Sequence, residues 1–172
     1  YYKLMAFNHD AQSETVKSDF VTVGLTVPLP YQNKLDTQDA FAEMDVVDAN
    51  ADGSTWTFAP NFSMASYTAN SQNAADDWLI APAVAVKKGA AYKFSFDAVN
   101  SYPDERVAAA VGTAPTAEGM TDEVIAPTVV SYQPRRRTLL GTFRATEDGV
   151  RYFGVHAVSN RDRSTLYVDH LQ

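Results

Sequence analysis

Apolar and polar residues alternate with a period of two through most of this chain, and this alternation limits the folds open to it. Tyr92, Phe94 and Phe96 alternate with Lys93, Ser95 and Asp97, which is typical of a strand with one buried face. Turn-forming residues separate such segments, and no long helical pattern lies between them. We therefore predict strands over 77–86, 92–97, 105–113, 123–130, 139–145, 150–158 and 165–171. Strands spaced in this way indicate an all-β sandwich or barrel.

Two local features modify this pattern. Pro82 interrupts the segment 77–86, which suggests an edge strand or a bulge there, because proline cannot donate to a sheet. A single short helix is expected over 39–44, with Asp36-Thr37 as its cap and acidic residues in its first turn.

The N-terminal part has a different organisation. Residues 1–24 have the pattern strand, polar turn, strand, and Val27-Pro28-Leu29-Pro30 marks a boundary after them. An isolated hairpin is only marginally stable in water. This hairpin therefore docks on the main domain, pairs with another chain as a hairpin-mediated dimer, or ends a truncated upstream domain. Because the chain begins in the middle of a strand-like pattern, we interpret it as a piece of a longer protein.

Charge and composition exclude several classes of function. The net charge is −7, whereas proteins that bind nucleic acid need a basic surface. The chain lacks cysteine, so disulfides, thiolate zinc sites and a cysteine nucleophile are excluded. No apolar run approaches the roughly 20 residues of a membrane-spanning helix. An acidic surface does suit divalent cations.

The most informative motif is Asp48-Ala49-Asn50-Ala51-Asp52-Gly53. Oxygen-bearing side chains stand at positions 1, 3 and 5, and glycine follows at position 6, as in the first half of a calcium-binding EF-hand loop. Position 12 is Ala59 instead of a bidentate glutamate, so the segment is not an EF-hand. The same spacing still holds calcium if distant residues complete the shell. The alternative is an ordinary turn, since Asn, Asp and Gly favour turns.

Other candidate positions have weaker signals. Asp76 and Asp77 would point to opposite faces of a strand. Trp56 and Trp78 lie in alternating segments, which favours the core over sugar stacking. Arg135-Arg136-Arg137 would suit sulfate or carboxylate recognition or cleavage by a trypsin-like protease, although a solvated turn is the default.

Evidence for catalysis is thin. The three histidines are scattered, and the chain has neither an H-E-x-x-H pair nor a G-x-S-x-G elbow. A glycosidase would need two carboxylates across a cleft, and acidic residues are plentiful enough that the sequence leaves this hydrolase alternative open. We expect that the protein is not an enzyme.

The order of three segments resembles the cleaved-adhesin family, also called choice-of-anchor J domains, which includes the haemagglutinin/adhesin domains of gingipains. These segments are Leu29 to Asp36, Phe41 to Trp56 with its acidic loop, and Ala75-Asp76-Asp77-Trp78-Leu79-Ile80-Ala81-Pro82. The closing Leu166-Tyr167-Val168-Asp169-His170-Leu171 continues the resemblance, which covers residues 29–172. Residues 1–24 resemble the end of a fibronectin type III domain. We therefore divide the chain into a fibronectin-like hairpin remnant over 1–27 and an adhesin domain over 28–172.

This resemblance implies a jelly-roll β-sandwich similar to MAM and carbohydrate-binding modules. It also implies structural calcium, display at the bacterial cell surface, and adhesion to a host extracellular protein or glycan. Carried over by position, the candidate calcium ligands are Asp48, Asn50, Asp52, Asp36 and Asp169. First and last strands often lie side by side in jelly rolls, so Asp36 and Asp169 are expected to meet.

Two alternatives to adhesion remain. A carbohydrate-binding module of a glycan-degrading enzyme predicts an exposed aromatic platform, for which Tyr67, Tyr102 and Tyr132 are candidates. A structural spacer would bind nothing. The fold class by itself does not decide between them.

Overall fold

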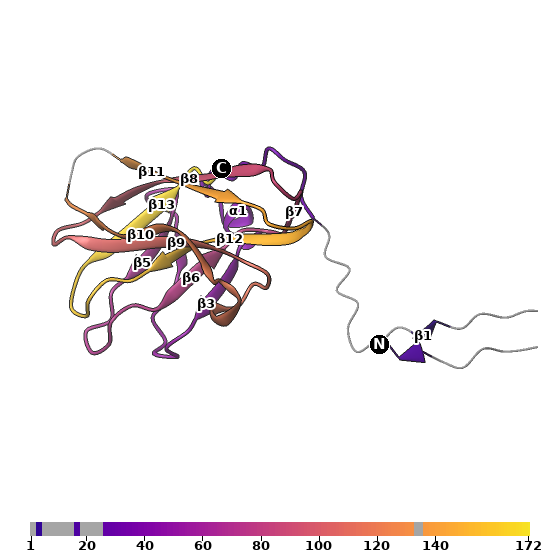
Figure 1. The fold of residues 1–172 in the computed structure, drawn as a ribbon. Helices are drawn as coiled ribbons and strands as arrows, with labels where there is room; N and C mark the ends of the chain where they lie inside the picture. Colours follow the sequence, from indigo (N-terminus) through magenta and orange to yellow (C-terminus); the bar gives the residue numbers. More distant parts are fainter. Residues whose placement is uncertain (1–2, 5–15, 18–25, 133–135) are drawn as a thin grey trace, which may run out of the picture.

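The computed structural model describes residues 3–4, 16–17, 26–132 and 136–172. Two antiparallel sheets face each other in this structure and enclose one main hydrophobic core (Figure 1). This arrangement is the predicted all-β sandwich, and it is an open sandwich with no closed barrel.

The first sheet has five strands in the order β11-β8-β13-β5-β4. Its strands are β4 (Thr57–Ala59), β5 (Met64–Thr68), β8 (Ala91–Asn100), β11 (Arg137–Arg144) and β13 (Thr165–Asp169). β11 shows the predicted alternation most clearly, because Leu139, Gly141 and Phe143 are buried while the residues between them are exposed. In this strand the buried residues face the second sheet and the residues between them face solvent.

The second sheet has the strand order β10-β9-β12-β6-β3, with β7 paired to β12. Its strands are β3 (Asp45–Asp48), β6 (Asp77–Ile80), β7 (Val84–Val86), β9 (Glu105–Gly112), β10 (Asp122–Val130) and β12 (Gly149–Ala157). The predicted strand 77–86 is thus two strands, β6 and β7, which both pair with β12 on either side of Pro82. The break follows from the proline, as expected from its missing N–H.

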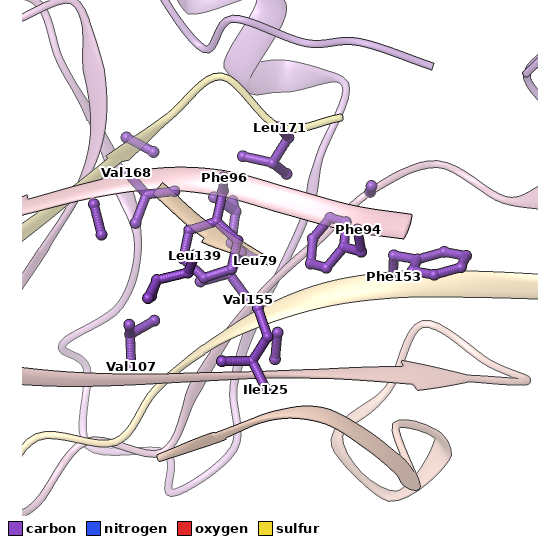
Figure 2. Close-up of a cluster of buried hydrophobic side chains, with 14 of the residues drawn as sticks. Leu79, Phe94, Phe96, Val107, Ile125, Leu139, Phe153, Val155, Val168 and Leu171 are labelled. Carbon is purple, nitrogen blue, oxygen red and sulfur yellow. The ribbon is translucent and has the colours of Figure 1, made fainter. Parts of the chain in front are cut away.

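The core lies between the two sheets. Figure 2 shows Phe94, Phe96 and Val168 of the first sheet packed towards Val107 and Val155 of the second. Trp56 also belongs to this core, whereas Trp78 lies in a smaller buried cluster with Ile80, Ala110 and Met120. Both tryptophans are buried, which confirms that they serve packing.

The remaining elements are short. The helix α1 spans Gln38–Ala42, and the Thr37 hydroxyl caps it by accepting a hydrogen bond from Ala40 N. It begins one residue before the predicted start and ends two residues before the predicted end. A 3₁₀ helix, η1, spans Ala117–Gly119. No helix in the described ranges is long and apolar enough to cross a membrane.

At the N-terminus, β1 (Lys3–Leu4) pairs antiparallel with β2 (Val16–Lys17), as a hairpin requires. The turn between them and the residues that would link them to the sandwich lie outside the described residues. Segment 26–36 leads into the sandwich through two isolated bridges, Val27 with Val84 and Asn33 with Leu171. The start of the domain therefore lies beside its last strand, as expected for a jelly roll.

Candidate functional site

Five connections gather at one end of the sandwich, which we call the loop end. They follow β3, β5, β8, β10 and β12, and their described residues are 49–56, 69–76, 101–104, 131–132 with 136, and 158–164. Backbone hydrogen bonds join some of them, for example from Ala75 N to Ser159 O (2.9 Å) and from Asp162 N to Asn70 O (2.8 Å). Antiparallel strands alternate in direction, so every second connection returns to the same end.

The Asp48–Gly53 loop lies at the loop end and folds around its own side-chain oxygens. Asp48 accepts hydrogen bonds from Asp52 N (3.2 Å) and Gly53 N (2.9 Å), and Asp52 accepts one from Ser54 N (2.8 Å). Asn50 Nδ2 donates to Ala74 O (2.8 Å), which fixes the loop to the connection before β6. Gly53 has a φ of +81°, the left-handed conformation that glycine adopts without strain. The three predicted calcium ligands of this loop are therefore brought together.

Asp77 lies beside this loop, and the sequence prediction did not include it among the ligands. It pairs with Asp48 across β3 and β6, and its side chain is fully buried. Its Oδ1 makes no hydrogen bond, and neither do the buried Thr55 Oγ1 and Tyr67 hydroxyl. The pKa of Asp77 is raised to about 6, mainly by burial and in smaller part by the negative charge of nearby Asp48.

The electrostatics of this cluster suit a cation. Within the described part of the chain, none of Asp48, Asp52 and Asp77 forms an ion pair with a basic side chain. Burial, together with the charges of Asp77 and Asp52, also raises the pKa of Tyr67. A buried carboxylate with an unpartnered oxygen is unfavourable unless a positive charge compensates it. Calcium prefers several oxygen ligands of this kind, so the types of side chain present suit the ion. The carboxylate oxygens of Asp48, Asp52 and Asp77 do not all lie within 4.8 Å of one another, so the loop and Asp77 would have to move closer to share one ion.

A second acidic cluster surrounds Asp169 in β13. Ligand atoms of Asp97, Asp169 and His170 lie within 4.8 Å of one another. Arg136 Nη2 is 2.8 Å from Asp169 Oδ2, so a positive charge already neutralises this carboxylate. Asp169 Oδ1 is buried without a hydrogen bond, although His170 Nδ1 is 3.2 Å away, and burial raises the pKa of Asp169.

Asp36 and Asp169 do not form the pair that we expected. Lys34 O accepts a hydrogen bond from His170 N, so the two chain segments are neighbours, but the exposed Asp36 makes no ion pair or hydrogen bond with Asp169. The reason is local, because Leu35 turns into the core with a φ of 55° before Asp36 enters the turn that caps α1.

Two exposed tyrosines lie on adjoining connections of the loop end. Tyr102 is 79% exposed and Tyr132 is 59% exposed. Asp104 joins their loops, because its carboxylate accepts hydrogen bonds from Tyr132 N and from the Ser131 hydroxyl, both at 3.2 Å. The buried Asn100 fixes the first loop by donating to Ser101 O (2.8 Å) and Pro103 O (2.9 Å). An aromatic pair is thus held at the surface by a polar scaffold.

The third candidate for an aromatic platform was wrong. Tyr67 is fully buried, because β5 is an interior strand and the side chain of Tyr67 packs against Trp56 at a centroid distance of 5.9 Å. Asp76 and Asp77 do point to opposite faces, as predicted, and Asp76 Oδ1 is 2.7 Å from His156 Nε2. Of the arginine run, Arg136 pairs with Asp169 and Arg137 donates to Val129 O, whereas Arg135 lies outside the described residues.

The fold is shared with known adhesin and cellulose-binding domains. No protein-family model matches the sequence, and no curated protein matches it either. The K1 cleaved adhesin domain of Lys-gingipain from Porphyromonas gingivalis has a similar structure, with a TM-score of 0.63 and 15% sequence identity over 82% of this chain and 95% of that domain. The K3 domain of the same protein has a TM-score of 0.58 and 16% identity over 76% of this chain and 88% of that domain.

A carbohydrate-binding module is also similar. The N-terminal cellulose-binding domain of β-1,4-glucanase C from Cellulomonas fimi has a TM-score of 0.54 and 18% identity over 85% of this chain and 95% of that domain. These likenesses confirm the gingipain-type resemblance at the level of the fold. The chain has the β-sandwich of adhesin domains and carbohydrate-binding modules.

Proposed function

We propose that this chain is a non-catalytic binding module that recognises a glycan at the bacterial cell surface or outside the cell. The observation that carries the proposal is the exposed pair Tyr102 and Tyr132, held on adjoining loops by Asp104. Tyrosine rings offer an apolar face to a sugar ring and a hydroxyl to its edge. The similarity in fold to a cellulose-binding domain supports a sugar as the ligand.

The first experiment measures binding of the purified chain to an array of bacterial and host glycans, followed by calorimetry with each hit. Tyr102→Ala and Tyr132→Ala should each weaken binding by at least tenfold, because each removes one stacking surface. Phe62→Ala is the matched control, since Phe62 is an exposed aromatic residue on a different part of the molecule. Equal affinities for all three variants would contradict the proposed site.

We further propose that calcium binds between the Asp48–Gly53 loop and Asp77 and stabilises the fold. The support is the fully buried, unpartnered Asp77 Oδ1 beside two further carboxylates that have no basic partner within the described residues. Asp48, Asn50 and Asp52 would supply the exposed side of the shell and Asp77 its buried side. For the Asp169 cluster calcium is a weaker proposal, because Arg136 already occupies one carboxylate oxygen.

A thermal melt with calcium and with excess chelator tests this second proposal, together with elemental analysis of the purified protein. Binding to the folded state alone raises stability by about 2.7 kcal/mol at a hundredfold excess over the dissociation constant. Asp48→Asn and Asp77→Asn should abolish the calcium-dependent shift, whereas Asp36→Asn should retain it. A melting temperature that calcium leaves unchanged would remove the proposal.

Adhesion to a host extracellular protein is the second candidate function. The exposed Phe62 packs against Tyr167 with tilted rings at a centroid distance of 4.8 Å, on the solvent face of the five-stranded sheet. Exposed aromatic residues of this kind are enriched in protein interfaces. Binding of a host matrix protein that Phe62→Ala weakens and Tyr102→Ala does not would favour this candidate.

A further inference from the structure

A groove with a volume of about 800 Å³ lies at the end of the sandwich opposite the loop end. Segment 29–32 forms one wall, and the first half of β8, residues 91–95, forms the other. Buried core residues Val84, Phe94 and Phe153 form part of its lining. β8 runs from this groove at Ala91 to the loop end at Asn100, a strand length of roughly 30 Å.

The edge of β8 that borders this groove carries unpaired backbone groups. Farther along β8, Ser95 exchanges two hydrogen bonds with Gln172, from Ser95 N to Gln172 O (2.8 Å) and from Gln172 N to Ser95 O (2.9 Å). In an antiparallel sheet, residues two apart point their N–H and C=O groups to the same side. Lys93 and Ala91 therefore present their backbone groups to the groove, and among the described residues no backbone partner meets them there.

The opposite edge of β8 is occupied throughout this stretch. β11 pairs with it in continuous register, from Arg144 opposite Ala91 to Arg137 opposite Ala98. The groove therefore lies along a free edge of β8, on the side where β13 pairs with β8 farther along the strand. Apolar residues form its floor. A row of unpaired backbone donors and acceptors recognises another backbone in extended conformation.

We propose that this groove binds an extended polypeptide strand of a partner protein, which adds to the five-stranded sheet antiparallel to β8. Recognition by strand addition takes its affinity from main-chain hydrogen bonds and its specificity from alternate side chains. The backbone groups of Lys93 and Ala91 would supply the hydrogen bonds that give affinity. The side chains that line the groove would supply the specificity.

The register predicts the sequence of the bound strand. Residues directly opposite each other share a face of the sheet. Phe94 points to the core, so the partner residue directly opposite Phe94 would also point to the core. An apolar residue is therefore favoured at that position of the partner strand and at every second position from it. Lys93 is exposed, so a glutamate opposite it would form an ion pair. The favoured partner therefore alternates β-branched apolar residues with acidic ones.

This inference is independent of the proposed glycan site, because the groove and Tyr102 lie at opposite ends of β8. A glycan is the other occupant to consider for a groove of this size. A glycan would not need to pair with the Lys93 amide as a neighbouring strand does. Dependence of binding on this amide therefore distinguishes a peptide from a glycan.

The test uses a short blocked peptide of alternating valine and glutamate, with binding followed by fluorescence anisotropy and by amide hydrogen exchange. Binding should slow exchange of the Lys93 amide at least tenfold. N-methylation of the glutamate amides should abolish binding, whereas N-methylation of the valine amides should be tolerated, since those amides point away from β8. Both peptides have the same side chains, so only the backbone bonds to β8 distinguish them.

A charge swap gives the second readout. Lys93→Glu should lower the affinity for the glutamate peptide roughly two- to fivefold. A peptide with lysine in place of glutamate should bind this variant with the original affinity. Three outcomes would overturn the inference: a Lys93 amide already protected in the free protein, equal binding of the two N-methylated peptides, or a groove that binds the array glycans and no peptide. Loss of glycan binding in Tyr102→Ala would leave it untouched.

Discussion

Asp77 is the residue whose ionisation most affects the fold at the loop end. Its pKa in the folded protein is about 6, against 3.8 for a free aspartate, because burial penalises the charge. Below pH 3.8 both the folded and the unfolded state hold the proton, so Asp77 does not affect stability. Between pH 3.8 and 6 only the folded state holds it, and stability therefore falls as the pH rises. The loss is complete above pH 6 and amounts to about 3 kcal/mol.

Calcium-free Asp77→Asn should therefore be more stable than the parent protein above pH 6 and show the same stability near pH 3.5. Denaturant unfolding across this range, after exhaustive dialysis, measures the difference. With calcium present the order should reverse above pH 6, because the ion stabilises the ionised carboxylate. Parallel pH profiles for the two calcium-free proteins would show that Asp77 ionises freely in the folded state.

The sequence indicated part of the proposed calcium site, and it missed the buried residue Asp77. The spacing of Asp48, Asn50 and Asp52 is a local signal, because one loop brings them together. Asp77 comes from another strand, and only the pairing of β3 with β6 places it beside Asp48. Asp36 was misplaced for the same reason, since contacts between distant segments depend on the exact turn that each takes.

At the level of elements, Asn100 positions the loop that carries Tyr102. Its side chain is buried and donates to Ser101 O and Pro103 O, so it holds the loop without touching solvent. Asn100→Ala should leave both carbonyls unpaired and cost about 1–3 kcal/mol of stability. It should also reduce glycan affinity several-fold with the tyrosines intact, as calorimetry would show. Unchanged affinity in a destabilised variant would mean that Asn100 serves the fold alone.

Gly112 marks a close approach between β9 and the loop that contains η1. A Cβ atom at this position would lie 2.2 Å from Gly119 O, a backbone atom that cannot move alone. Gly112→Ala should therefore lower the free energy of unfolding by about 1–3 kcal/mol, through displacement of this loop. At Gly149→Ala the nearest atom is the end of the Arg151 side chain at 3.1 Å, so this control should cost much less. Chemical unfolding compares the two, and equal costs would contradict the close contact.

The strands that the sequence predicted are those with long, regular alternation. β9, β11 and β12 were each expected within about two residues of their observed bounds, and β8 within three, since one buried face fixes the pattern over many residues. β3, β4 and β5 were not predicted. β5 carries four buried residues in succession, and β3 and β4 are too short to show a period. Their positions depend on pairing with neighbours.

For the whole molecule, the same hydrogen-bond network connects the calcium loop and the tyrosine pair. The Asp52 carboxylate accepts a hydrogen bond from Ser54 N, and the Ser54 hydroxyl accepts one from Asn70 Nδ2 (3.2 Å). The backbone carbonyl of Asn70 in turn accepts a hydrogen bond from Asp162 N (2.8 Å). Two residues after Asp162, Ser164 N donates a hydrogen bond to the buried Glu105. Glu105 is next in the chain to Asp104, whose carboxylate accepts the hydrogen bond from Tyr132 N. The two proposed ligands would therefore bind to one connected set of loops.

Calcium should consequently raise glycan affinity as well as the melting temperature. A typical coupling of 1–3 kcal/mol corresponds to a change of about 5- to 150-fold, and thermodynamic linkage requires the glycan to raise calcium affinity by the same factor. Calorimetry of each ligand with and without the other measures both sides of this cycle, and Asp52→Asn should abolish the coupling. If calcium raises the melting temperature and leaves glycan affinity unchanged, the loops act independently. Calcium would then serve only the stability of the sandwich, while Asp104 and Asn100 alone would position the tyrosines.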